Sequence, residues 1–183
     1  MTLLEQLRPS YANLWGKMIV NHDRLYEVNN TIAQIKRGVI EYKAIEAAIG
    51  VPWRFVGVTH SMECDCNFHE HLHNGDPLTA RTVQVPAGRP LTGNPPFTWH
   101  DSAIDALTMR HLSAANDWSI EGMLFQFEAY NGFGSRNNHG INTPYLWSGS
   151  NQYLKGKYVA DGKYDPNEIS KQIGAALLLK GLM

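Results

Sequence analysis

Cysteine is scarce in this chain, with only Cys64 and Cys66 among its 183 residues. A single residue separates the two, and a disulfide across so short a gap would be strained, so we expect two free thiols. The sequence therefore lacks the disulfide framework that stabilises many small secreted domains.

An excess of either charge is also missing. The chain has 16 Lys and Arg residues against 17 Asp and Glu residues, interspersed, for a net charge of −1. A nucleic-acid-binding domain typically carries a basic excess on one face, so nucleic acid is not an expected partner. The same balance argues against strong electrostatic capture by an anionic surface.

Long hydrophobic runs and targeting segments are absent as well. The longest apolar stretch near the end, Ala175–Leu179, is far shorter than the roughly 20 residues that cross a membrane, so no membrane insertion is expected. Glu5 stands where a secretory signal would carry basic residues followed by an apolar core. We therefore expect no signal peptide, and a protein that stays in the cytoplasm until something else releases it.

What is present is a globular composition, 43% apolar and 18% charged, with strong helical periodicity. Apolar stripes at helical spacing predict a first helix behind Pro9-Ser10, a second from about residue 25 to Gly38, and a third over 39–49 that ends at Gly50. These stripes are typical of core packing, and nothing in them suggests catalysis.

A fourth helix is predicted from Pro52, and Glu63 lies near its end. Its apolar side chains form one face, while Glu63 projects from a more polar face beside His60. Desolvating a carboxylate is costly, so Glu63 is expected to be paired, exposed in a cleft or used in catalysis. A place near the helix end suits a residue at the lip of a cleft.

A strong turn signal, residues 74–77, follows this helix. After it, residues 79–86 alternate between polar and apolar side chains, which predicts a short half-buried strand. Residues 86–96 are rich in Pro and Gly and predict a rigid loop. We expect a small β-hairpin or three-stranded flap in this region.

The remainder reads as helical again, apart from a long loop that reaches about Tyr164. Thr98 and Asp101 have the spacing of a capping box before a helix over 102–113. Further helices are predicted over 118–130 and from Asp165 to about Lys180. The expected fold class is α+β, mainly α, in one domain over 1–183. Its regions are N-terminal helices at about 1–50, a central helix and β flap at about 51–97, and C-terminal helices with a cleft loop at about 98–183.

The polar residues that best suit catalysis are Glu63, Asp76 and Thr82. A glycosidase needs an acid that protonates the scissile oxygen, and a second group that activates water or stabilises the cationic transition state. The apolar residues around Glu63 would favour its protonated form, whereas Asp76 in a polar turn would stay ionised. Thr82, on the adjoining strand, could hold a water.

The same residues support a family resemblance. A Glu at a helix end, an Asp in the turn before a hairpin and a Thr six residues later resemble the pattern of phage-type lysozymes. Residues 60–68 resemble the Glu-centred motif of goose-type lysozymes and lytic transglycosylases, and 127–132 resemble their Ala-Tyr-Asn-Ala-Gly motif. Residues 71–82, 144–149 and 155–162 resemble lysozyme-fold phage endolysins and bacterial wall hydrolases.

The resemblance implies a lysozyme-like domain that hydrolyses the β-1,4 bond between MurNAc and GlcNAc of bacterial peptidoglycan. Glu63 would be the general acid, Asp76 the second carboxylate and Thr82 its assistant. Such an endolysin would be a monomer without cofactor or metal, kept in the host cytoplasm until its release to the cell wall. The expected substrate-binding residues are His60, Gln84, Tyr130, Asn131, Tyr145 and Trp147. For the aromatic ones, burial as loop anchors is the alternative.

Two alternatives keep different chemistry open. A lytic transglycosylase would cut the same bond with Glu63 alone, without a catalytic water. A zinc-dependent amidase or peptidase could use the five possible ligands Cys64, Cys66, His69, His71 and His73. No second pair of ligands follows at the usual zinc spacing, so we expect hydrogen bonding from these side chains instead of metal binding. A non-catalytic wall-binding module using the aromatic loop is a third hypothesis.

Overall fold

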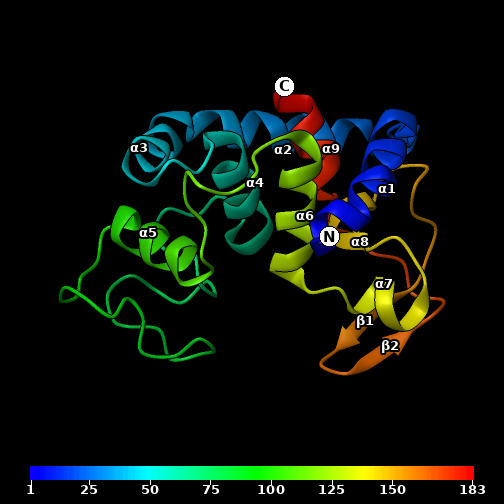
Figure 1. Cartoon of the computed structure of the whole chain (residues 1–183). Helices are drawn as coiled ribbons and strands as arrows, with labels where there is room; N and C mark the ends of the chain where they lie inside the picture. Colours follow the sequence, from blue (N-terminus) through cyan, green and yellow to red (C-terminus); the bar gives the residue numbers. More distant parts are fainter. The chain divides into compact units, whose positions relative to one another are not determined.

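Nine α-helices, a short 3₁₀ helix and one two-stranded antiparallel sheet make up the computed structural model, which describes residues 1–183 (Figure 1). This confirms a mainly helical chain with a small β element. None of its helices combines the length and apolar character that a membrane crossing requires. The elements are α1 (Leu3–Lys17), η1 (His22–Arg24), α2 (Leu25–Arg37), α3 (Val39–Ile49), α4 (Trp53–Cys64), α5 (Trp99–Met109), α6 (Ile120–Asn131), α7 (Gly134–His139), α8 (Pro144–Trp147), β1 (Lys157–Ala160), β2 (Lys163–Asp165) and α9 (Ala175–Leu182).

The chain divides into two compact units. The first combines residues 1–32 with 117–183, and the second is residues 33–116. Helix α2 contributes residues to both units, so the division falls inside a continuous helix. The expectation of a single catalytic domain stays a prediction.

In the first unit, α1 packs on α6, and α6 and α8 pack on α9. Helix α1 begins earlier than predicted, because Thr2 and Glu5 form a capping box and Pro9 lies inside the helix. Six of the eight residues of α9 are buried. Gly174 precedes it because a side chain there would overlap the carbonyl oxygen of Leu146.

In the second unit, α3 packs on α4 and α5. Helix α3 has the predicted bounds and ends at Gly50, whose φ of 73° is the left-handed conformation that glycine adopts without strain. The Thr98–Asp101 capping box is confirmed at the start of α5. A long irregular segment, residues 65–98, joins α4 to α5 (Figure 1).

The predicted strand over 79–86 is wrong, because this stretch contains no strand. The backbone N–H groups of Val83 and Gln84 donate to the carboxylate of Asp76 instead of to a neighbouring strand. The sheet lies at β1 and β2, within the stretch predicted as a loop. The last helix was also predicted to begin too early, since Asp165 belongs to β2 and α9 begins at Ala175.

Candidate functional site

Glu63 occupies an exceptional position on α4. Every other residue from Phe55 to Cys64 is buried, whereas Glu63 is half-buried. Asp65 and Cys66 have φ values of 48° and 57°, a left-handed turn that ends the helix after Cys64, one residue beyond Glu63. The helix thus presents one carboxylate at the only place in this stretch where solvent reaches it.

His60 lies in the interior, one turn before Glu63, and is fully buried. Its Nε2 lies 3.1 Å from the indole nitrogen of Trp99 and 3.2 Å from the Asn67 carbonyl, and its Nδ1 lies 3.1 Å from the Tyr42 hydroxyl. Burial lowers the pKa of His60 to about 4, so the ring is neutral at pH 7. It packs among aromatic rings, and a substrate cannot touch it as the sequence analysis expected.

The carboxylate of Asp76 is only 6% exposed and accepts four hydrogen bonds. Oδ2 accepts from the backbone N–H groups of Val83 (2.8 Å) and Gln84 (3.0 Å) and from the Asn74 amide (3.0 Å), while Oδ1 accepts from the Gln84 side chain (3.2 Å). The Gln84 backbone donor is the main cause of the lowered pKa of Asp76. Asp76 is therefore ionised, and its carboxylate fixes the loop backbone at Val83 and Gln84 through these hydrogen bonds.

Thr82 and Gln84 serve the same loop. The Thr82 hydroxyl donates to the Pro86 carbonyl (2.5 Å) and accepts from the Arg89 backbone N–H (2.9 Å). Thr82 is buried, so its hydroxyl has no free capacity to hold a catalytic water. Gln84 is exposed but uses its side-chain amide on Asp76. The structure thus gives these two residues and Asp76 a role in shaping residues 82–89.

The histidines that suggested a zinc site are engaged elsewhere. His71 Nε2 donates to the Ala80 carbonyl (2.8 Å), and its Nδ1 lies 2.9 Å from the Ser102 hydroxyl. His73 Nε2 lies 2.8 Å from the Asp105 carboxylate. No three His, Cys, Asp or Glu side chains anywhere in the chain lie together so that they could hold a metal ion. The zinc alternative therefore lacks its ligand geometry.

The two thiols are buried to different degrees. Burial, with smaller contributions from the charges of Glu63 and Glu70, raises the pKa of Cys64 to about 12. Its thiol donates to the His71 carbonyl (3.3 Å). The pKa of Cys66, which is half-buried, is also raised by burial. Both are therefore protonated and poorly reactive at neutral pH, as expected of free structural cysteines.

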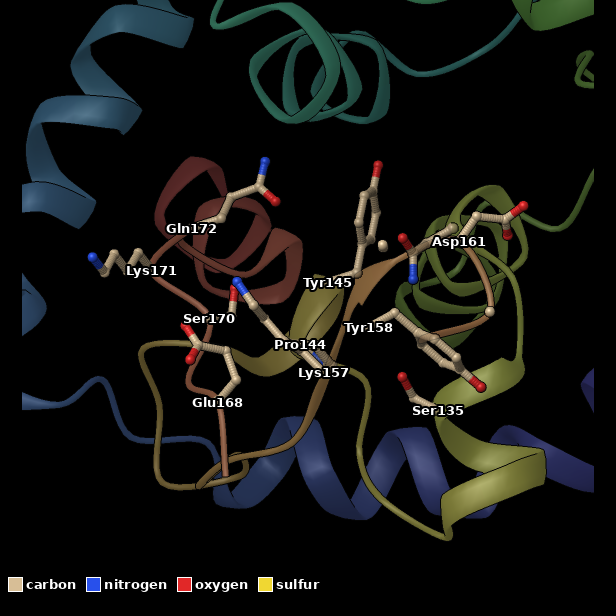
Figure 2. Close-up of a pocket in the computed structure, with 13 residues that line it drawn as sticks. Ser135, Pro144, Tyr145, Lys157, Tyr158, Asp161, Glu168, Ser170, Lys171 and Gln172 are labelled. Atoms are coloured by element: carbon tan, nitrogen blue, oxygen red, sulfur yellow. The ribbon is translucent and has the colours of Figure 1, made fainter. Parts of the chain in front are cut away.

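The first unit contains a cavity of about 780 Å³ (Figure 2). Asn131, at the end of α6, and Tyr145, on α8, line it, so the structure brings these two expected sugar-binding residues to one cavity. Tyr130 is buried, and Trp147 is fully buried with no hydrogen-bond partner for its indole N–H. Trp147 is therefore a core residue of this unit.

Sequence reasoning missed the other walls of this cavity. The β1–β2 hairpin contributes Lys157, Tyr158 and Asp161, and the segment before α9 contributes Glu168 and Lys171. The sequence contains a signal for this hairpin, because Asp-Gly between two β-prone stretches is typical of a hairpin turn. The hairpin therefore could have been found from the sequence, but not its place beside residues 168–172.

Glu128, on α6, is fully buried. It accepts from the Tyr11 hydroxyl (2.6 Å) and from two nitrogens of Arg136 (2.9 and 2.7 Å). Burial and the hydrogen bond to Glu128 raise the pKa of Tyr11. Glu128 therefore joins α1, α6 and α7, and solvent does not reach it.

Comparisons with known proteins give no further guide to function. No family model matches the chain, and no curated protein or solved structure matches it. The function has to be argued from the residues.

Proposed function

We propose that this chain cleaves the β-1,4 bond between MurNAc and GlcNAc in peptidoglycan, with Glu63 as its general acid. The observation that carries the proposal is the half-buried carboxylate of Glu63 on a helix whose other residues from Phe55 to Cys64 are buried. The family resemblance of residues 60–68 and the mainly helical fold agree with it. A lysozyme-like arrangement is part of this proposal.

The environment of Glu63 suits an acid catalyst. It lies in the last turn of α4, just before the left-handed conformation at Asp65 and Cys66 that ends the helix. A carboxyl group that solvent reaches at the end of a buried helix is placed to give a proton to a glycosidic oxygen.

The hydrogen bonds of Asp76 favour a mechanism in which Glu63 is the only catalytic carboxylate. A two-carboxylate hydrolase needs a second group free to activate water or to attack the sugar, whereas Asp76 is only 6% exposed and accepts four hydrogen bonds. In the proposed reaction Glu63 gives its proton to the leaving oxygen as the bond from the sugar carbon breaks. The resulting carboxylate then takes a proton from the incoming nucleophile. That nucleophile is water in a hydrolase, or a hydroxyl of the same sugar in a lytic transglycosylase.

Replacing the proposed acid tests this directly. Glu63→Gln should fold like the parent and lose about 10²–10⁴-fold in the rate of peptidoglycan cleavage, the usual contribution of a general acid. Glu70→Gln is the matched control, because Glu70 is a half-buried carboxylate near the same helix end. Circular dichroism checks the fold, and turbidity clearance of purified cell walls gives the rate.

A parental rate in Glu63→Gln would refute the proposal. Mass spectrometry of the parent's products separates the two reactions, since hydrolysis leaves new reducing ends and transglycosylation leaves anhydro-muramoyl ends. The occupied carboxylate of Asp76 leads us to expect anhydro ends.

A further inference from the structure

The cavity of the first unit is lined by four charged side chains, two of each sign. Lys157, Asp161, Glu168 and Lys171 all line it. None of the four belongs to an ion pair, although ion pairs occur elsewhere in the chain. Unpaired charges of both signs around one cavity favour a ligand that itself carries both charges.

Lys157 is the most informative of the four. It is half-buried, whereas the other three residues of β1 are exposed. Asp165 is its partner in the strand register, yet the two form no ion pair, and the Asp165 carboxylate accepts from the Asn167 backbone N–H instead. Figure 2 shows the Lys157 side chain extending along the cavity toward Ser170. A half-buried lysine that forms no ion pair is suited to an anionic group of a ligand.

The cavity walls are held in place before any ligand arrives. The Tyr158 hydroxyl is 3.0 Å from the Asn138 amide and 3.1 Å from the His139 ring, which stacks on Tyr164 with a centroid distance of 3.5 Å. On the other wall, the Ser170 backbone N–H donates to the Tyr153 hydroxyl (3.2 Å). Such bracing lowers the ordering cost of binding.

The size and chemistry fit a short peptide better than a sugar chain. The volume of about 780 Å³ lies within the range of small-molecule sites. A neutral oligosaccharide needs hydrogen bonds and ring stacking but no separated charges. A peptide with carboxylates and a free amine can complement the lysines and the acids together.

We propose that this cavity binds the stem peptide of peptidoglycan, with a stem carboxylate on Lys157. The identity of the peptide rests on the proposed function, whereas the preference for a ligand of both charges rests on the cavity alone. The cavity would then select wall polymer that carries stems over bare glycan.

Binding to the Glu63→Gln chain tests this without cleavage of the probe. The probe is the soluble tripeptide L-alanyl-γ-D-glutamyl-meso-diaminopimelate, and chitotetraose is the neutral sugar comparison. Calorimetry should detect the tripeptide, with about tenfold weaker affinity when Lys157→Gln is added, as expected for loss of one charge-assisted hydrogen bond. Lys163→Gln is the matched control, because Lys163 is exposed on the same hairpin and does not line the cavity; it should bind like the parent.

Three results would overturn the inference. They are no binding of the tripeptide, equal affinities of the Lys157→Gln and Lys163→Gln chains, and competition for the cavity by chitotetraose. Failure of the proposed function is seen separately, as absence of cleavage of purified peptidoglycan by the parental chain. Tripeptide binding without such cleavage would support the proposed binding site and refute the proposed enzymatic activity.

Discussion

Several polar side chains of the second unit shape its loops. Asp76 accepts four hydrogen bonds, Thr82 makes two, and His71 uses both ring nitrogens. Each would be costly to bury without partners, so the loop over 67–91 forms in the one arrangement that satisfies them. At the residue scale, Glu63 stands apart because it is half-buried, whereas the other residues from Phe55 to Cys64 are buried.

Asp76→Asn should destabilise the chain at neutral pH and much less in acid. The lowered pKa of Asp76 means that its contribution is complete above the unfolded-state pKa of about 3.9 and is lost as the pH falls through the lower folded value. Urea unfolding of parent and variant at several pH values measures the gap between their midpoints.

The difference in urea midpoint between the parent and Asp76→Asn should become smaller as the pH falls below the ordinary Asp pKa. The Asp76 carboxyl group of the parent then becomes protonated and loses its charge. Asp161→Asn serves as control, because Asp161 is exposed and should leave the midpoint unchanged. A gap that stayed constant down to strong acid would show that Asp76 does not act through its charge.

At the scale of elements, one buried ion pair joins three helices of the first unit. Glu128 on α6 accepts from Tyr11 on α1 and from Arg136 on α7. Burial alone would lower the pKa of Arg136, but the hydrogen bonds and charge of Glu128 outweigh it and raise the pKa. Arg136 therefore stays charged and depends on Glu128 as its counter-charge.

Glu128→Gln should cost about 3–5 kcal/mol of unfolding free energy, because it leaves the guanidinium of Arg136 without its counter-charge. Glu121→Gln, on the same helix, removes only a solvent-accessible pair with Arg8 and should cost below about 1 kcal/mol. Chemical denaturation of the two variants compares them. Equal costs would contradict the assignment of Glu128 as the central residue of this contact.

Close packing of α4 gives a second test at this scale. A Cβ at Gly57 would lie 2.7 Å from the Ile35 side chain and 2.9 Å from the Tyr42 ring, whereas one at Gly16 on α1 meets nothing within 4 Å. Gly57→Ala should therefore destabilise by about 1–3 kcal/mol. Gly16→Ala should stabilise by about 0.5–1 kcal/mol, the usual helix preference for alanine. Stabilisation by both substitutions would show that α4 is packed more loosely than its contacts indicate.

At the scale of the whole molecule, the two candidate regions belong to different units. Glu63 and its surrounding loops lie in residues 33–116, and the charged cavity lies in residues 117–183. Helix α2 carries the chain from one unit into the other. The acid and the proposed stem site can therefore be tested independently, as the two experiments above do.

Signals that act over three or four residues were sufficient to predict much of the secondary structure. The sequence determined the bounds of α3 through its stripe and Gly50, and the start of α5 through the Thr98–Asp101 box. It also determined the mainly helical class and singled out Glu63 as a carboxylate near the end of a helix. These features depend on neighbours in the chain, which the sequence lists in order.

Only the tertiary structure decided what the polar residues do. The Asp76 carboxylate takes the backbone donors that a strand over 79–86 would need, and His60 is surrounded by aromatic rings. The cavity brings β1 beside residues 168–172, a neighbourhood that no local pattern encodes. A hydrogen-bond partner distant in sequence leaves no periodic trace, so the role of each carboxylate depends on the fold.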